Sequence, residues 1–115
     1  MRKTILAISC IALHAPIALA QTSQKTDLLL YEVATRSCGQ YVKAHDAQSE
    51  EFGYYVSWLQ GYLSAVNLHS VFVRQDIGKG KDMQSMLLWL KNHCTQHALE
   101  DFGLAVLSLA AELKR

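Results

Sequence analysis

The first twenty residues determine the compartment in which the rest of this chain folds. Arg2-Lys3 forms a basic start, and an uncharged apolar run follows from Ile5 to Leu13. Ala18-Leu19-Ala20 then supplies small residues at the positions that a signal peptidase reads just before its cut. We therefore predict a signal peptide at residues 1–20, cleaved after Ala20, and export to a bacterial periplasm.

Two other interpretations of this segment are weaker. A retained membrane anchor needs about 20 apolar residues, whereas this run has roughly 15 and is broken by His14 and Pro16. Lipidation at Cys10 would leave a much shorter apolar core and would make the site ending at Ala20 redundant. Cleavage after Ala20 remains the prediction.

Cleavage leaves two of the three cysteines, Cys38 and Cys94. An even pair in an oxidising compartment predicts one intramolecular disulfide. Counted inclusively, the bond would close a loop of 57 residues, which is worth about 4 kcal/mol on the chain-entropy model. The remaining 95 residues form a domain that buries only about 60–65% of its unfolded surface, so this stabilisation would matter. The alternative is a pair of buried, reduced thiols.

The net charge argues against two classes of partner. Losing Arg2 and Lys3 with the leader leaves nine Lys and Arg against ten Asp and Glu, a formal charge of −1. A near-neutral chain without a basic stripe offers no electrostatic basis for binding nucleic acid. It offers none for a membrane surface either. We expect a single domain, with an N-terminal segment at residues 21–36 and a helical domain at residues 37–115.

Helical periodicity and capping residues predict an all-α fold of four helices. The mature chain contains no proline, which permits long helices. Ser37, Ser49 and Asp82 are predicted N-caps, for helices at about 38–47, 50–71 and 83–94. Glu100 and Asp101 are expected in the first turn of a last helix, because carboxylates suit its positive end. The apolar segment at 28–33 is ambiguous between strand and helix.

The helix at 50–71 is apolar over most of its circumference, so we expect it to lie centrally among the others. Its small residues Ser57, Gly61 and Ala65 lie four positions apart, a row where a neighbouring helix can approach closely. We also expect Asn67, inside this apolar helix, to hydrogen-bond a loop backbone.

An aromatic row lies beside the small one, at Tyr54, Trp58 and Tyr62. Such a row is more often part of a core. Tyrosine and tryptophan also keep a polar edge that protein interfaces favour, so a partner-binding role stays open.

Residues 74–81 are the clearest predicted loop, because two glycines relax the backbone. Its basic residues are further candidates for partner contact: Arg74, Lys79 and Lys81. A phosphate-binding loop is disfavoured, since the glycine spacing is wrong and Asp82 stands where a Ser or Thr is required.

The last two helices should turn apolar residues inward. In the third these are Met86, Leu87, Trp89 and Leu90. In the last they are Leu99, Phe102, Val106, Leu109 and Leu113.

Candidate catalytic and metal-ligating groups are sparse. The sequence has no Gly-x-Ser-x-Gly elbow and no Cys-x-x-Cys pair, so we predict no enzyme, catalytic residue or cofactor. His93 and His97 flank Cys94 at helical spacing. Zinc requires three or four ligands, and Cys94 is committed to the disulfide. We therefore interpret them as two surface histidines near a helix end and predict no metal site.

Three segments resemble a family of small exported bacterial proteins, and the resemblance covers nearly the whole mature chain. The segments are Ser37-Cys38-Gly39-Gln40-Tyr41, Trp58-Leu59-Gln60-Gly61-Tyr62-Leu63-Ser64-Ala65-Val66-Asn67 and Trp89-Leu90-Lys91-Asn92-His93-Cys94. Where the family usually has a proline after the second cysteine, this chain has Ala98, which would extend or re-angle the last helix. The two-cysteine helical plan also resembles HdeA-type acid-stress chaperones and the Tai-type immunity proteins that neutralise type VI secretion amidases. The resemblance implies an HdeA-like periplasmic domain with an internal disulfide, often a homodimer.

From these features we predict a non-enzymatic periplasmic domain that binds another protein. Its sharpest form is an inhibitor-like immunity protein directed against a cell-wall amidase. The alternative is an acid-stress chaperone, because at pH 2 the mature chain would carry roughly +13 and loosen by self-repulsion. A third class is an assembly subunit of an envelope complex.

Overall fold

The computed structural model describes residues 30–69 and 76–114. These residues form a 3-10 helix and four α-helices, which are η1 (Glu32–Thr35), α1 (Cys38–Ala47), α2 (Glu50–His69), α3 (Met83–Gln96) and α4 (Phe102–Leu113). The predicted all-α domain of four helices is confirmed. The leader, its cut after Ala20 and Arg74 lie outside the described residues.

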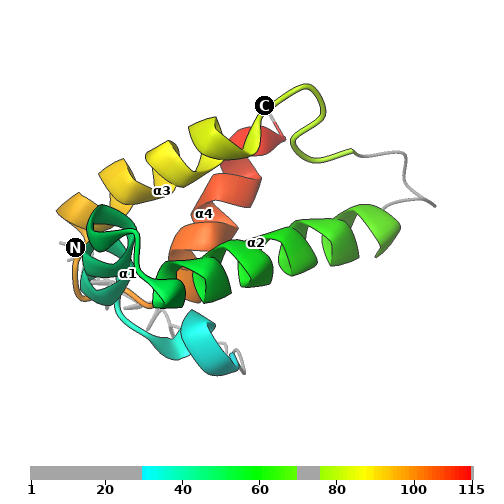
Figure 1. Ribbon diagram of the computed structural model, residues 1–115. Coiled ribbons are helices and arrows are strands. Elements are labelled where there is room, and N and C mark those ends of the chain that lie inside the picture. Colours follow the sequence, from blue (N-terminus) through cyan, green and yellow to red (C-terminus); the bar gives the residue numbers. More distant parts are fainter. Residues whose placement is uncertain (1–29, 70–75, 115) are drawn as a thin grey trace, which may run out of the picture.

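The four helices form a small bundle with α4 between α2 and α3 (Figure 1). Helix α1 closes one end, where it packs against the beginning of α2 and the end of α3. The short η1 lies against α4 and α2. Of the segment at 28–33, residues 28–29 lie outside the described residues, 30 and 31 are not helical, and Glu32 and Val33 belong to η1. None of the helices described in 30–69 and 76–114 has the length and hydropathy needed to cross a bilayer.

Side-chain capping sets the start of two helices, α1 and α3, as predicted. The Ser37 hydroxyl accepts from the Gln40 amide, and the Gln40 side chain accepts from the Ser37 amide, which forms a capping box. Asp82 accepts from the Ser85 amide at 2.8 Å and begins α3. Helix α2 begins at Glu50, directly after Ser49, whose hydroxyl donates to the Ala44 carbonyl.

The start of the last helix differs from the prediction. Helix α4 begins at Phe102, with Asp101 at the N-cap, and Leu99 and Glu100 belong to the turn before it. The inner-face role predicted for Leu99 is wrong, since its side chain is 96% exposed. The helical period does not apply to a residue in a turn. Phe102, Val106 and Leu109 are buried as predicted.

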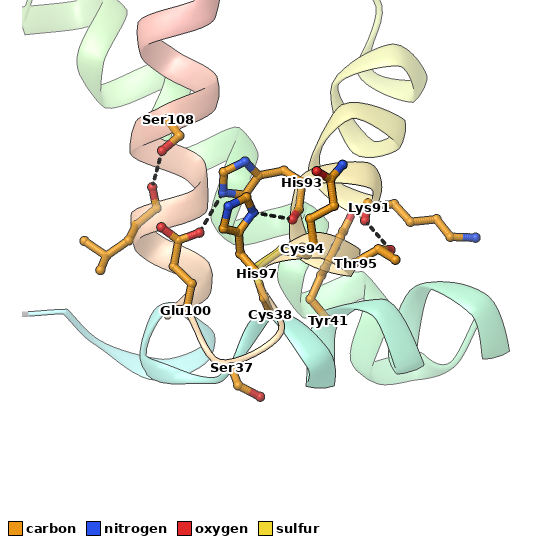
Figure 2. The surroundings of a disulfide bond; sticks show 12 residues. Ser37, Cys38, Tyr41, Lys91, His93, Cys94, Thr95, His97, Glu100 and Ser108 are labelled. Carbon is orange, nitrogen blue, oxygen red and sulfur yellow. Dashed lines mark hydrogen bonds and ion pairs between the residues drawn. A yellow bond between two sulfur atoms is a disulfide. The ribbon is translucent and has the colours of Figure 1, made fainter.

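The disulfide joins Cys38 in the first turn of α1 to Cys94 near the end of α3 (Figure 2). Both residues are fully buried, with their Cα atoms 4.7 Å apart. The Cys38 amide donates to the Glu100 carbonyl at 2.7 Å, and the Gly39 amide to the Ala98 carbonyl at 2.9 Å. The start of α1 therefore holds both the end of α3 and the turn that leads into α4.

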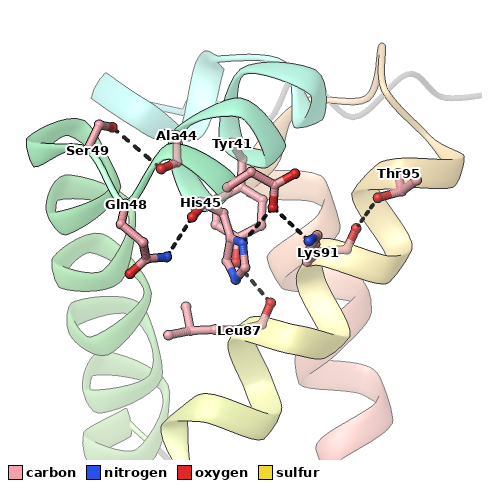
Figure 3. A network of polar contacts seen from close by, with 9 residues as sticks. Tyr41, Ala44, His45, Gln48, Ser49, Leu87, Lys91 and Thr95 are labelled. Carbon is pink, nitrogen blue, oxygen red and sulfur yellow. Dashed lines mark hydrogen bonds and ion pairs between the residues drawn. The ribbon is translucent and has the colours of Figure 1, made fainter.

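Three fully buried rings, Tyr41, Tyr55 and Phe102, form the centre of the core. The Tyr41 ring lies 5.3 Å from Tyr55 and 4.9 Å from Phe102, centroid to centroid. Its hydroxyl donates to the Leu87 carbonyl at 2.9 Å (Figure 3). Burial raises the pKa of the Tyr41 phenol well above its ordinary value. The phenol therefore stays neutral and links α1 to α3 inside the core.

The central position predicted for α2 is wrong. This helix turns one narrow row inward, formed by Tyr55, Leu59 and Leu63, and leaves its opposite side to solvent. Helix α4 instead buries half of its residues, Phe102, Gly103, Ala105, Val106, Leu109 and Ala110. The reason is that α4 is flanked on both sides, whereas α2 packs along its inner side only.

A surface ion pair links α1 to α3, in addition to the buried hydrogen bond from Tyr41 to the Leu87 carbonyl (Figure 3). Lys91 Nζ lies 2.6 Å from Asp46 Oδ1, and His45 Nδ1 lies 3.1 Å from the same oxygen. Hydrogen bonds from Lys91 and then His45 hold the pKa of the Asp46 carboxyl below its ordinary value of 3.8. The folded state therefore favours the ionised carboxylate.

Removing the disulfide should cost a large share of the stability. We expect Cys38→Ser/Cys94→Ser to lower the free energy of unfolding by about 4 kcal/mol, because a long loop in the unfolded chain is released. Urea unfolding followed by circular dichroism measures the change. Adding a reductant should shift the wild-type midpoint and leave that of the double variant unchanged. Equal unfolding midpoints for the disulfide-bonded wild type and the double variant, both without reductant, would contradict the prediction.

The Asp46 pair should give a pH-dependent contribution to stability. Since its pKa is lower in the folded protein, the contribution is complete above the ordinary carboxyl value and is lost as the pH falls through the lowered one. Asp46→Asn should therefore lower the free energy of unfolding at pH 7, with the deficit closing in acid. Urea titrations across this range measure it. Lys91→Met should behave likewise, and a deficit independent of pH would argue against the pair.

Candidate functional site

The aromatic row of α2 is divided between core and surface. Tyr54 is 57% exposed, whereas Trp58 and Tyr62 are half-buried and pack against the core. The Trp58 and Tyr62 rings are stacked, with centroids 5.7 Å apart and planes 8° from parallel. The Tyr54 hydroxyl donates to Glu50 Oε1 at 3.2 Å. The row is thus anchored in the core at two positions and presents the third to solvent.

A pocket of about 480 Å³ lies where this row meets η1. It is lined by Glu32, Val33, Arg36, Tyr54, Ser57 and Trp58. Arg36 also forms an ion pair with Glu51 at the edge of the same region. The pocket has an aromatic wall from α2 and a charged rim from η1 and the residue that follows it. We refer to its lining residues together with the exposed side of α2 as the α2–η1 face.

The small row belongs to this face and not to a helix–helix contact. Ser57, Gly61 and Ala65 are all exposed, and a Cβ added at Gly61 would meet no atom within 4 Å. The close approach predicted there is therefore wrong within the described chain. Larger apolar residues on the other side of α2, Tyr55 and Leu59, take the inward position, since burying them removes more apolar surface from water.

The predicted loop residues lie away from the α2–η1 face. Lys79 is exposed and pairs loosely with Asp76 at 4.0 Å. Lys81 lines a different pocket, of about 330 Å³, between the beginning of α3 and the end of α4, together with the half-buried Trp89. Of the described residues predicted to contact a partner, Tyr54 and Trp58 line the first pocket and Lys81 lines the second, whereas Tyr62 and Lys79 line neither.

Asn67 makes the loop contact expected of it. Its amide donates to the Ile77 carbonyl at 3.2 Å, and its carbonyl oxygen accepts from the Ile77 amide at 2.8 Å. These two bonds fix the described part of the loop against α2, and Ile77 is buried there.

A cluster of three potential metal ligands lies beside the disulfide (Figure 2). His93 lies in the last turn of α3, His97 is the C-cap residue that follows the helix, and Glu100 lies in the turn before α4. His93 Nε2 lies 2.6 Å from Glu100 Oε2. One ligand atom from each residue lies within 4.8 Å of the others. Imidazole nitrogens and a carboxylate oxygen are groups that bind divalent transition metals.

Sequence reasoning missed Glu100 as a member of this cluster. His93 was expected on the surface, but its side chain is only 19% exposed. The positions 93, 97 and 100 follow helical spacing, which is the one signal in the sequence that could have grouped them. Glu100 was instead expected in the first turn of the last helix, as a carboxylate that suits its positive end.

Two glycine variants test the packing of the helices: Gly61 lies on the exposed side of α2, and Gly103 lies on the buried side of α4. Gly61→Ala should raise the free energy of unfolding by about 0.5–1 kcal/mol, because alanine has a higher helix propensity than glycine and its Cβ would meet no atom within 4 Å. Gly103→Ala in α4 should lower it, since the new Cβ would lie 3.2 Å from the Ala34 carbonyl oxygen and 2.8 Å from Leu30 Cδ1. Such overpacking costs about 1–3 kcal/mol. Thermal unfolding of both variants gives the two signs, and a destabilised Gly61→Ala would indicate a buried α2 face.

Comparisons with protein-family models, with curated proteins and with solved structures found no match.

Proposed function

We propose that this protein is an exported binding domain that recognises another protein through the α2–η1 face. The observation that carries the proposal is the exposed Tyr54 at the edge of the 480 Å³ pocket, beside a stacked Trp58–Tyr62 pair. Tyrosine, tryptophan and arginine are the residues in which interface hot spots are enriched. All three types occur on this face.

The rigidity of the face supports tight binding. Trp58 and Tyr62 stack on each other and pack on the core, so their rings are already ordered before a partner arrives. Ordered aromatic rings lose little conformational entropy on association, which leaves more of the contact energy for affinity. The pocket beside them has a volume of about 480 Å³, which is room for an apolar side chain from the partner.

The edges of the face complement this apolar centre. Arg36 and Glu51 form an ion pair at this face, and Glu50 accepts a hydrogen bond from Tyr54. An apolar centre with a polar rim is the usual organisation of a protein interface. Ser57, Gly61 and Ala65 add a flat strip on which a helix or strand of the partner can lie closely.

A cell-wall amidase is the partner to test first. The resemblance of the two-cysteine helical plan to Tai-type immunity proteins motivates this choice. An inhibitor of this kind needs to cover about 800 Å² on each partner. The exposed side of a 20-residue helix together with η1 has the dimensions for such a contact.

Site-specific crosslinking in the exporting cell tests the face. A photo-reactive amino acid at Ser57, on the edge of the pocket, should give a discrete adduct with one other protein at neutral pH. The matched position is Leu88 on α3, which is 55% exposed and should give none. Tyr54→Ala should then weaken binding of the captured protein by about tenfold or more, measured by calorimetry, while Leu88→Ala leaves it unchanged.

Three outcomes would contradict the proposal. Equal adducts from both positions would indicate that this face is not special. A single adduct with a second copy of the chain would make it a homodimer interface. Adducts with many proteins, formed only in acid, would favour the chaperone function.

A further inference from the structure

We propose that His93, His97 and Glu100 form a binding site for a divalent transition-metal ion, with Zn²⁺ as the ion that fits the ligand set best. Their ligand atoms lie within 4.8 Å of one another, at the junction of α3 with the turn before α4 (Figure 2). The inference concerns a different region from the α2–η1 face and does not depend on the function proposed for that face.

The ligand chemistry matches zinc. Two imidazole nitrogens and one carboxylate oxygen are a set that zinc uses in proteins, with bonds of about 2.0–2.2 Å and a fourth position left for water or another group. Calcium and magnesium prefer sites built from oxygen ligands. Copper(II) should bind the same nitrogens more tightly than zinc in vitro, as the general order of metal affinities requires.

Small side-chain rotations bring the three groups to coordinating distance. In a tetrahedral site with such bonds, neighbouring ligand atoms lie about 3.3 Å apart. His93 Nε2 and Glu100 Oε2, now 2.6 Å apart, would open by less than an ångström. The widest separation in the cluster, within 4.8 Å, would close by up to about 1.5 Å.

The backbone that carries the ligands is already fixed. The disulfide holds Cys94, which directly follows His93 in the chain. The Glu100 amide donates to the His97 carbonyl at 2.9 Å, and the Glu100 carbonyl accepts from the Cys38 amide at 2.7 Å. Preorganisation of this kind reduces the entropy that a metal site otherwise loses on binding.

The ring contacts also orient the donor atoms. His97 Nδ1 lies 2.9 Å from the His93 carbonyl oxygen, which can only accept, so the proton is on Nδ1. In the neutral ring this leaves a lone pair on Nε2 of His97, the arrangement found in metal-bound histidines. His93 is stacked on both Trp89, at 5.1 Å, and His97, at 4.3 Å between centroids. An ion pair between His93 and Glu100 alone would not need His97 beside it, whereas a metal site needs this third ligand.

Calorimetry with zinc chloride on the untagged, disulfide-bonded protein tests the site. We expect one Zn²⁺ per chain. Loss of an outer hydrogen-bond partner usually costs 10–100-fold in metal affinity, so loss of a direct ligand in His97→Ala or Glu100→Gln should weaken binding by at least that factor. The matched control is His69→Ala, an exposed histidine at the end of α2, which should leave the affinity unchanged.

One measurement on the wild-type protein, and one on tryptophan variants that keep all three proposed ligands, make the test independent of whether the ligand variants fold. In NMR spectra the imidazole signals of His93 and His97 should shift with Zn²⁺, while those of His45 and His69 stay in place. In Trp58→Phe, Cu²⁺ should quench the remaining fluorescence of Trp89, which stacks on His93. In Trp89→Phe, the fluorescence of Trp58 should be unaffected.

The proposal is overturned if no one-to-one binding is found. It is equally overturned if binding persists in folded His97→Ala and Glu100→Gln, or if the histidine signals that shift are those of His45 and His69. Circular dichroism of each variant establishes that it is folded.

Discussion

The Cys38–Cys94 disulfide and the hydrogen bonds around it fix one end of the bundle, and the remaining structure is arranged from that end. Cys94 brings the end of α3 to the first turn of α1. The amides of Cys38 and Gly39 then donate to carbonyls of the turn at 98–100, and the Phe102 amide donates to the Arg36 carbonyl at 2.8 Å. Residues 36–39 are thus joined to residues 94–102 by one disulfide and three hydrogen bonds. The disulfide joins residues 56 positions apart in the sequence. It therefore lowers the conformational entropy of the unfolded chain and the entropy cost of forming these long-range contacts.

This fixed end explains why the core and the exposed face differ in character. With α1, α3 and the start of α4 held together, Tyr41 and Phe102 meet at 4.9 Å, and the Tyr41 hydroxyl finds a partner in the Leu87 carbonyl. Helix α2 adds Tyr55 to this cluster and packs along its inner side only. Its outer side is left without a covering element in the described chain. A domain with a well-packed core and one uncovered aromatic side is consistent with the binding function that we propose.

The sequence predicted what local chemistry decides and failed where distant contacts decide. Ser37 and Asp82 cap their helices through bonds to residues three positions away, so the beginnings of α1 and α3 could be read directly. The start of α4 depends on bonds from residues 36–39, far earlier in the chain, and Leu99 was therefore misplaced. The Gly61 row failed for another reason. Spacing of four residues marks a side of a helix, but it does not say whether that side or its neighbour faces the core.

The same limit hid the cluster of His93, His97 and Glu100. The two histidines could be grouped from helical spacing alone, whereas Glu100 reaches His93 because the turn carrying it is bonded to α1. A metal ion bound there would connect α3 to the turn before α4, directly beside the disulfide that connects α3 to α1. The two links would act on one junction, the disulfide permanently and the metal reversibly. Since an ion that binds only the folded state adds to its stability, the junction that organises the fold would also be the point at which metal supply regulates it.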